Sequence, residues 1–315
     1  MSSIDRDSAA DGGAVCRAAF GRDGLIVVPR LVDSELIEAL RADMAAQWSR
    51  RAVAGGRVQD LWVRSAAVRR LAGHPGIAGA LHELYGRRPI PFQTLSFRTG
   101  TEQPLHADTI HFDTVPGGWM CGVWVALEEV GPTQGPLRWV PGSHLVTGPR
   151  PEGFGAGAVF DNPGYEAAVE AQVEAQGWHA EQLLVRAGDA VIWSAEVLHG
   201  GATVTDPAST RWSQVTHYVF EGFPAVTPQK SRPAQGHWWL RDPVVNVATL
   251  RTERGVDPTT GASAPIRMRR GLARFPRPTD PAPSVVERCA SAALGACRRA
   301  RVAPRLLRAR LVRSR

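Results

Sequence analysis

The stretch Leu105-His106-Ala107-Asp108-Thr109-Ile110 is the part of this sequence that says most about its fold. In an extended strand, residues i and i+2 point to the same face, so His106 and Asp108 would present an imidazole and a carboxylate side by side. A second imidazole, His199, follows far downstream. Two histidines and one carboxylate cover one face of a metal ion and leave the opposite positions open, as in non-haem Fe(II) oxygenases. The stretch therefore predicts a strand over 105–110 and a metal site.

Arg211 adds a cation downstream of His199. Its planar guanidinium stays protonated at physiological pH and binds a carboxylate through two parallel hydrogen bonds. A metal site followed by such a cation points to a reaction in which a carboxylate-bearing molecule takes part.

Periodic patterns predict the surrounding elements. Apolar residues at helical spacing predict a helix over 34–48, with Asp33 as its N-cap. A second helical region covers 65–85 and is broken at His74-Pro75-Gly76. Strand-forming runs cover 94–98, 105–110, 120–128, 137–140, 190–193 and 211–220. Short strands separated by Gly/Pro turns favour a sandwich or jelly roll, with the helices packed on its outside.

Several further motifs occur in order along the chain. They are His106–Phe112, Gly122–Glu128, Gly135–Leu137, Pro141–His144, Ala187–Trp193, Leu198–Gly201 and Thr210–Ser213. Together they resemble the phytanoyl-CoA dioxygenase family, from about Phe20 to about Leu240. The resemblance implies a mainly β fold with flanking helices, a double-stranded β-helix (jelly roll, cupin-like). It also implies an Fe(II)- and 2-oxoglutarate-dependent dioxygenase that uses O2 to hydroxylate a small-molecule metabolite, releasing succinate and CO2.

The same resemblance implies roles for individual residues. His106, Asp108 and His199 would hold Fe(II), and Arg211 would bind the distal carboxylate of 2-oxoglutarate. Ser213 would add a hydroxyl donor, whereas Trp124 packs either beside the cosubstrate or in the core. Loss of the metal carboxylate would open a halide site, so the presence of Asp108 favours hydroxylation over halogenation.

Other histidines compete for these roles. His111 and Asp113 form a second His-x-Asp pair, but a turn begins at Val115 almost directly after it, and the family pattern places its ligands at the first pair. His144 reads as a turn residue after Pro141-Gly142. His217 shares a strand face with Arg211 and is a candidate for the pocket wall.

A different class of function uses the same barrel. Cupin-like metal-dependent isomerases and non-catalytic small-molecule binding proteins hold other metals with a similar ligand set. Such proteins have no use for Arg211 with Ser213 on the strand after the distal histidine, so the oxygenase reading is preferred.

The charge distribution divides the chain. Of the net charge of +7, residues 265–315 contribute +12, from 14 arginines against Asp280 and Glu287, and residues 1–264 contribute −5. We expect a catalytic domain over 1–264 and a basic, Arg/Pro-rich tail over 265–315 that contacts an anionic surface or an acidic partner. Nucleic acid is not expected, because no aromatic residue interleaves with the arginines after Phe275.

Within the catalytic domain, residues 145–185 interrupt the strand pattern with a Gly/Pro-rich segment and a helix predicted over 165–176. An insertion of this kind between barrel strands is typical of an active-site lid.

The cysteines and the apolar segments indicate the cellular compartment. The four cysteines show no paired spacing, and the N-terminus lacks the apolar core of a signal peptide. No apolar stretch is long enough to cross a bilayer. We therefore expect a cytoplasmic protein with free thiols and no transmembrane segment.

Overall fold

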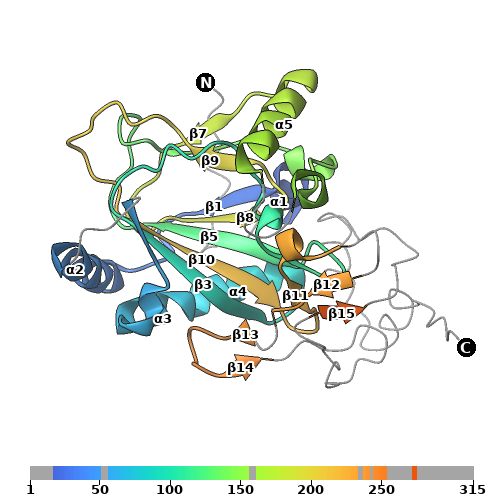
Figure 1. Cartoon of the computed structure of the whole chain (residues 1–315). Coiled ribbons are helices and arrows are strands. Elements are labelled where there is room, and N and C mark those ends of the chain that lie inside the picture. Colours follow the sequence, from blue (N-terminus) through green and yellow to red (C-terminus); the bar gives the residue numbers. More distant parts are fainter. Residues whose placement is uncertain are drawn as a thin grey trace, which may run out of the picture.

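The computed structural model describes residues 17–50, 56–155, 161–232, 237–241, 244–253 and 272–274 (Figure 1). Of the expected basic tail, only 272–274 lies inside these ranges, so the tail's expected contacts fall outside the described residues. Among the described helices there is none whose length and apolar character would let it cross a membrane.

A six-stranded antiparallel sheet forms the centre of the fold. Its strands, in spatial order, are β1 (Leu25–Val28), β8 (Ala190–Ser194), β5 (Met120–Ala126), β10 (Ser213–Phe220), β3 (Pro89–Phe97) and β2 (Arg57–Gln59). A three-stranded sheet lies over one face of it and contains β7 (Glu181–Leu183), β6 (Leu137–Trp139) and β9 (His199–Gly201) (Figure 1). The two facing antiparallel sheets form the predicted jelly roll.

The central strand β5 shows why the large sheet is covered on both faces. Every residue of β5 is buried. Val123 and Val125 belong to the core cluster formed with the helices, whereas Trp124 and Ala126 belong to the cluster between the two sheets. Successive side chains of a strand point to opposite faces, so one apolar run supplies both cores.

Helices cover the outer face of the large sheet. They are α1 (Arg17–Asp23), α2 (Ser34–Arg50), α3 (Ala66–Ala72) and α4 (Pro75–Tyr85). The N-cap predicted for α2 is confirmed, since the Asp33 carboxylate accepts a hydrogen bond from the backbone N–H of Leu36 at 2.9 Å. The predicted break is also confirmed: α3 ends before Gly73, and Pro75 opens α4.

The strand predicted over 105–110 is wrong in the structure. Only His106 makes an isolated antiparallel bridge, to His199, and Asp108–Ile110 form a 3₁₀ helix. The Asp108 carbonyl accepts hydrogen bonds from the backbone N–H groups of His111 (2.9 Å) and Phe112 (3.0 Å), which turns the chain where a strand would continue. The predicted strand over 211–220 begins two residues late, at Ser213.

The insertion expected over 145–185 contains a short 3₁₀ helix (Pro151–Phe154), α5 (Asn162–Ala175) and β7. From α5, Tyr165 and Val169 pack against Leu105 and Leu198, next to the two histidine ligands. The Tyr165 hydroxyl accepts a hydrogen bond from the backbone N–H of Ala107 at 3.3 Å. This helix therefore supports the loop that carries His106 and Asp108; the lid assignment stays a prediction.

The C-terminal part of the described chain adds small two-stranded sheets at one end of the barrel (Figure 1). They pair β4 (Asp113–Thr114) with β11 (Ala225–Val226), β12 (His237–Trp239) with β15 (Leu272–Arg274), and β13 (Val244–Val245) with β14 (Thr252–Glu253). Strand β15 lies beyond the expected boundary at residue 264.

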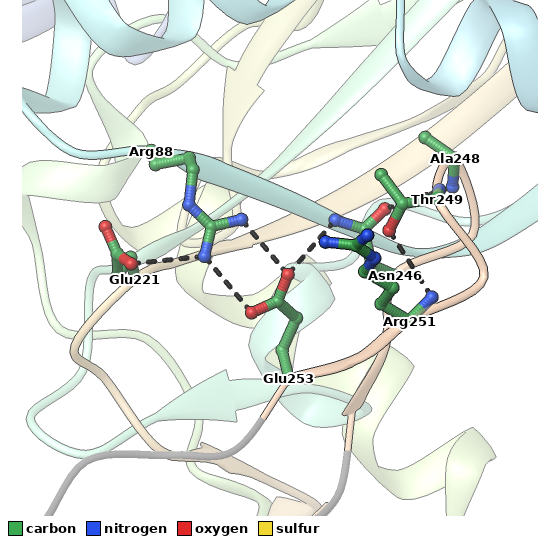
Figure 2. Close-up of polar contacts among 7 residues, drawn as sticks. All are labelled: Arg88, Glu221, Asn246, Ala248, Thr249, Arg251 and Glu253. Carbon is green, nitrogen blue, oxygen red and sulfur yellow. Dashed lines mark hydrogen bonds and ion pairs between the residues drawn. The ribbon is translucent and has the colours of Figure 1, made fainter. Parts of the chain in front are cut away.

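An ion-pair network ties the β13–β14 hairpin to the large sheet. Figure 2 shows Arg88, next to β3, between Glu253 of β14 and Glu221, which follows β10; both ion pairs measure 3.1 Å. The Glu253 carboxylate also contacts the side-chain amide of Asn246 at 3.5 Å. The Arg88 hydrogen bond holds the pKa of Glu253 below its ordinary value.

Candidate metal centre

The structure brings the three predicted ligands together between the sheets. The backbones of His106 and His199 exchange two hydrogen bonds, at 2.9 and 3.0 Å, and their imidazole ring centroids lie 4.6 Å apart. From Asp108, Oδ1 lies 3.9 Å from His106 Nε2 and 3.8 Å from His199 Nε2. One potential ligand atom from each residue lies within 4.8 Å of the other two. The strand predicted for 105–110 is replaced by a bridge and a turn, yet the side chains still converge.

Backbone carbonyls orient both imidazoles. His106 Nδ1 lies 2.9 Å from the carbonyl oxygen of Pro104, and His199 Nδ1 lies 3.0 Å from that of Val197. A carbonyl only accepts, so each Nδ1 carries the proton and each Nε2 presents a lone pair. Burial lowers the pKa of His106 to about 4 and also lowers the pKa of His199. Both rings are therefore neutral at pH 7, as metal ligands must be.

The Asp108 carboxylate has a partner on its second oxygen. The indole N–H of Trp193 donates to Oδ2 at 2.8 Å, and His217 Nε2 lies 3.5 Å from the same oxygen. Burial acts to raise the pKa of Asp108, but His217 and His199 outweigh it and hold that pKa well below its usual range. Asp108 is thus ionised, with Oδ1 facing the two histidines. Two neutral imidazoles and one buried carboxylate fit a divalent iron ion.

Gly122 makes the Trp193 contact possible. The two residues are paired across β5 and β8, and a Cβ atom at position 122 would overlap the indole ring. The absence of a side chain at Gly122 leaves room for the indole to pass this position and reach Asp108. Gly122 and Trp193 both lie in motifs that carry the family resemblance, Gly122–Glu128 and Ala187–Trp193, but nothing in the sequence indicated that they meet.

A cavity of about 340 Å³ opens beside the three ligands. Arg211 lies on its wall, is only 3% exposed and stacks 5.8 Å from the ring of Trp124, which also lines the cavity. Its guanidinium donates to the carbonyl oxygen of Gly135 at 2.6 Å, its Nε has no partner, and within the described ranges it forms no ion pair. Burial lowers the pKa of Arg211 to about 10, so the group remains a cation. A buried charge without a counter-ion is costly, which fits a site for an anionic ligand.

The other predicted residues fall in three places. Ser213 is buried beside Arg211, but its hydroxyl donates to the Arg211 carbonyl oxygen at 3.3 Å, and it is not among the described residues that line the cavity. Its role as a cosubstrate donor stays a prediction. His111 and His217 do line the cavity, whereas His144 lies in a 3₁₀ turn beside Gly21.

The competing pair does not assemble in the same way. The Asp113 carboxylate accepts a hydrogen bond from the backbone N–H of Thr114 at 2.7 Å, and no metal-ligand group among the described residues includes His111 or Asp113.

Comparison with known proteins gives the chain's relatives. The sequence profile of the family described as Phytanoyl-CoA dioxygenase (PhyH) matches residues 20–211. No curated protein matches the sequence. Similar solved structures include a non-heme alpha ketoglutarate dependent carbocyclase, SnoK from nogalamycin biosynthesis, at 19% identity and a TM-score of 0.57, over 70% of this chain and 90% of that one.

Two further structures carry ligands. The epimerase SnoN in complex with Fe3+, alpha ketoglutarate and nogalamycin RO matches at 24% identity and a TM-score of 0.53, over 67% of this chain and 84% of that one. EctD from S. alaskensis with 2-oxoglutarate and 5-hydroxyectoine matches at 19% identity and a TM-score of 0.53, over 68% of this chain and 78% of that one. At these identities the likeness shows a shared fold.

Proposed function

The chain belongs to the phytanoyl-CoA dioxygenase family of non-haem iron and 2-oxoglutarate-dependent oxygenases, and from this premise we propose a hydroxylase of a small-molecule metabolite that releases succinate and CO2. The ligand set would be His106, Asp108 and His199, with Arg211 as the cosubstrate cation. The observation that carries the proposal is Arg211, a buried cation with no carboxylate partner among the described residues, on the wall of the cavity that holds the metal ligands.

Each group of the chain has a defined task in this proposal. Bound iron(II) supplies the oxidising chemistry by coupling O2 reduction to decarboxylation of 2-oxoglutarate. His106 and His199 offer neutral lone pairs, and Asp108 supplies the negative charge that holds the cation. Arg211 binds the distal carboxylate of the cosubstrate, and Trp124 provides a flat apolar wall beside it. Because Asp108 occupies the third ligand position, no halide site is left there.

Hydroxylation is one of several outcomes compatible with the fold. The similar structures include a carbocyclase and an epimerase. We favour hydroxylation because it needs no second reacting centre in the substrate. A succinate-release screen of the iron-loaded enzyme against a metabolite library, followed by product mass spectrometry, tests this. Gain of one oxygen atom by the product is expected; loss of hydrogen or an unchanged mass would replace hydroxylation by cyclisation or epimerisation.

The alternative is a cupin-like metal-dependent isomerase or binding protein. Arg211, which has no carboxylate partner among the described residues, disfavours this alternative, because an isomerase without a dicarboxylate cosubstrate has no ligand to offset the cost of burying this charge.

Cytoplasmic location is part of the proposal. Its support is Cys121, which is buried as a free thiol, because disulfides are rare in reducing compartments.

Arg211→Ala is the decisive variant. Removing one partner of a buried charged pair costs about 3–5 kcal/mol, and each 1.4 kcal/mol or so is a tenfold change in affinity. We therefore expect 2-oxoglutarate affinity to fall roughly a hundredfold or more, while iron affinity changes little. Arg211→Lys should give an intermediate affinity, because an ammonium cannot form the two-pronged contact. Anaerobic titration of the metal-to-ligand charge-transfer band measures both affinities.

The matched control is Arg87→Gln, which removes an exposed guanidinium stacked on Phe223 outside the described cavity wall. Its 2-oxoglutarate affinity should equal that of the wild type. Unchanged affinity in Arg211→Ala would remove the cosubstrate assignment and favour the isomerase alternative.

A further inference from the structure

A second arginine, Arg241, lines the cavity and has no role in the proposed cosubstrate site. Its guanidinium carbon lies 4.7 Å from the ring centroid of Phe112 and 5.1 Å from that of Phe92. Within the described part of the chain its side chain makes no hydrogen bond or ion pair. Burial lowers the pKa of Arg241, and Asp60 acts in the opposite direction. Yet the Asp60 carboxylate accepts hydrogen bonds from Trp62 and the backbone of Thr94, and it does not pair with Arg241.

The two phenylalanines place this cation near the metal ligands. Phe92 and Phe112 pack edge to face at 5.3 Å, and their ring centroids lie 6.2 and 5.7 Å from that of His217. His217 in turn lies 3.5 Å from the Asp108 carboxylate. The Arg241 backbone is anchored by a 2.8 Å hydrogen bond to the carbonyl of Ala225 in β11. Contact with the two rings keeps the guanidinium oriented and leaves its N–H groups free for a ligand.

Arg211 and Arg241 belong to different ends of the cavity. Arg211 lies two residues before β10, at the end where Ser213 pairs with Phe97. His217 lies further along the same strand, opposite Gln93. Arg241 packs on Phe112 beside His217, and so lies towards the opposite end of this stretch of chain from Arg211. A cosubstrate whose distal carboxylate is bound at Arg211 therefore leaves Arg241 without an anion.

The charge balance of the cavity also indicates that a positive charge is left without an anion when the cosubstrate is bound. Its described lining contains three arginines (Arg57, Arg211 and Arg241), and Asp108 is its one carboxylate. With iron(II) and dianionic 2-oxoglutarate bound, three arginines and a divalent ion stand against one carboxylate and two ligand charges. Two positive charges remain, and a cleft with an excess of one sign favours a ligand of the opposite sign.

We propose that Arg241 is a specificity-determining residue that binds a carboxylate or phosphate group of the primary substrate, while Phe112, which also lines the cavity, contacts its apolar body. This inference rests on the proposed function, because it assigns the primary substrate of the same metal site. The substrate class is thus a small anionic molecule with an apolar portion, held at its charged end by Arg241.

The test uses three probes of similar shape on the full chain. Benzoate, phenyl phosphate and neutral benzamide are titrated by calorimetry into the anaerobic iron(II) enzyme at saturating 2-oxoglutarate, so that Arg211 is occupied. We expect one of the two anions to bind about ten- to hundredfold more tightly than benzamide, as for loss of a charge-assisted hydrogen bond. The anion that binds more tightly identifies carboxylate or phosphate as the group recognised.

Variants connect any preference to Arg241. Arg241→Gln should abolish the preference while 2-oxoglutarate affinity, which also reports folding, stays unchanged. Arg241→Lys should retain part of the preference, and Arg87→Gln should retain all of it. Equal affinities in the wild type, no binding of any probe, or a full preference in Arg241→Gln would overturn this inference alone. Failure of 2-oxoglutarate to bind would overturn the proposed function, and this inference with it.

Discussion

The Trp193 indole shows how one residue outside the ligand set shapes the metal centre. Its N–H occupies Oδ2 of Asp108 and leaves Oδ1 directed at His106 and His199. Hydrogen bonds of this kind orient a ligating carboxylate and tune its affinity for the metal. The carboxylate is therefore held ready before any metal binds.

Trp193→Phe should weaken iron(II) binding by roughly ten- to a hundredfold, the usual cost of losing a partner of a metal ligand. Trp139→Phe is the matched control, because Trp139 is buried in the same inter-sheet cluster and its indole nitrogen has no hydrogen-bond partner. Anaerobic iron titrations compare the two, with His106→Ala as the variant that loses the site and His111→Ala as one that keeps it. Equal affinities in the two tryptophan variants would contradict the role of the hydrogen bond.

At this scale the sequence identified the groups that do chemistry but not those that orient them. His106, Asp108, His199 and Arg211 were predicted from residue type and order, and the structure brings them to one cavity. Trp193 and Arg241 were not predicted, because a tryptophan in a strand and an arginine in a loop have many ordinary explanations. Their contacts depend on register and on chain segments distant in sequence, which periodicity does not report.

Among the elements, the segment around the first two ligands departs most from expectation. The run over 105–110 was predicted to be a strand that presents His106 and Asp108 on one face, but the chain pairs only at His106 and turns at Asp108. Local hydrogen bonds to the Asp108 carbonyl replace the ladder. Longer elements followed their patterns, the helical apolar spacing in α2 and the continuous apolar run in β5, because there burial and pattern agree over many residues.

The support that α5 gives to this turn can be measured. Val169 is fully buried against the ligand segment, so Val169→Ala should lower the free energy of unfolding by about 1–3 kcal/mol. Glu170→Ala, on the exposed face of the same helix, should change it by less than about 0.5 kcal/mol. Urea unfolding of the metal-free protein provides the comparison. Equal stabilities would show that α5 does not support the ligand loop.

The hairpin bound by Arg88 predicts a pH effect. Because the folded-state pKa of Glu253 lies below its ordinary value of 4.5, its contribution to stability is present above about that pH and is lost as pH falls through the folded pKa. The wild type should therefore be more stable than Arg88→Gln at pH 7, by less than about 1 kcal/mol since the pair is partly exposed. The gap should close in acid, as measured by thermal unfolding; a gap that persists below about pH 3 would contradict the linkage.

For the whole molecule, the boundary of the catalytic unit depends on β15. This strand pairs with β12, which lies just before Arg241, although it follows the boundary expected from charge. Charge composition shows where the sequence becomes basic, but it does not indicate which residues beyond that point pair with strands of the catalytic domain.

Two truncations test whether β15 belongs to the catalytic unit. A chain ending after Phe275 retains β15, and one ending after Ala264 lacks it. Both should bind iron(II) and 2-oxoglutarate as the full chain does, because the proposed ligands lie between His106 and Arg211. The shorter chain alone should unfold at a lower temperature. Loss of 2-oxoglutarate affinity in a folded truncated protein would make the tail part of the catalytic unit.

The backbone bridge between His106 and His199 also determines when in the life of the protein iron can be acquired. The two imidazoles come together only after strands from both halves of the chain have paired. On the ribosome, a nascent chain that has not yet exposed residue 199 holds an incomplete set of ligands. In a zinc finger the ligands lie close together in sequence and the metal drives folding. Here the ligand set is complete only after distant segments have paired, so we expect iron to be acquired after residue 199 has left the ribosome.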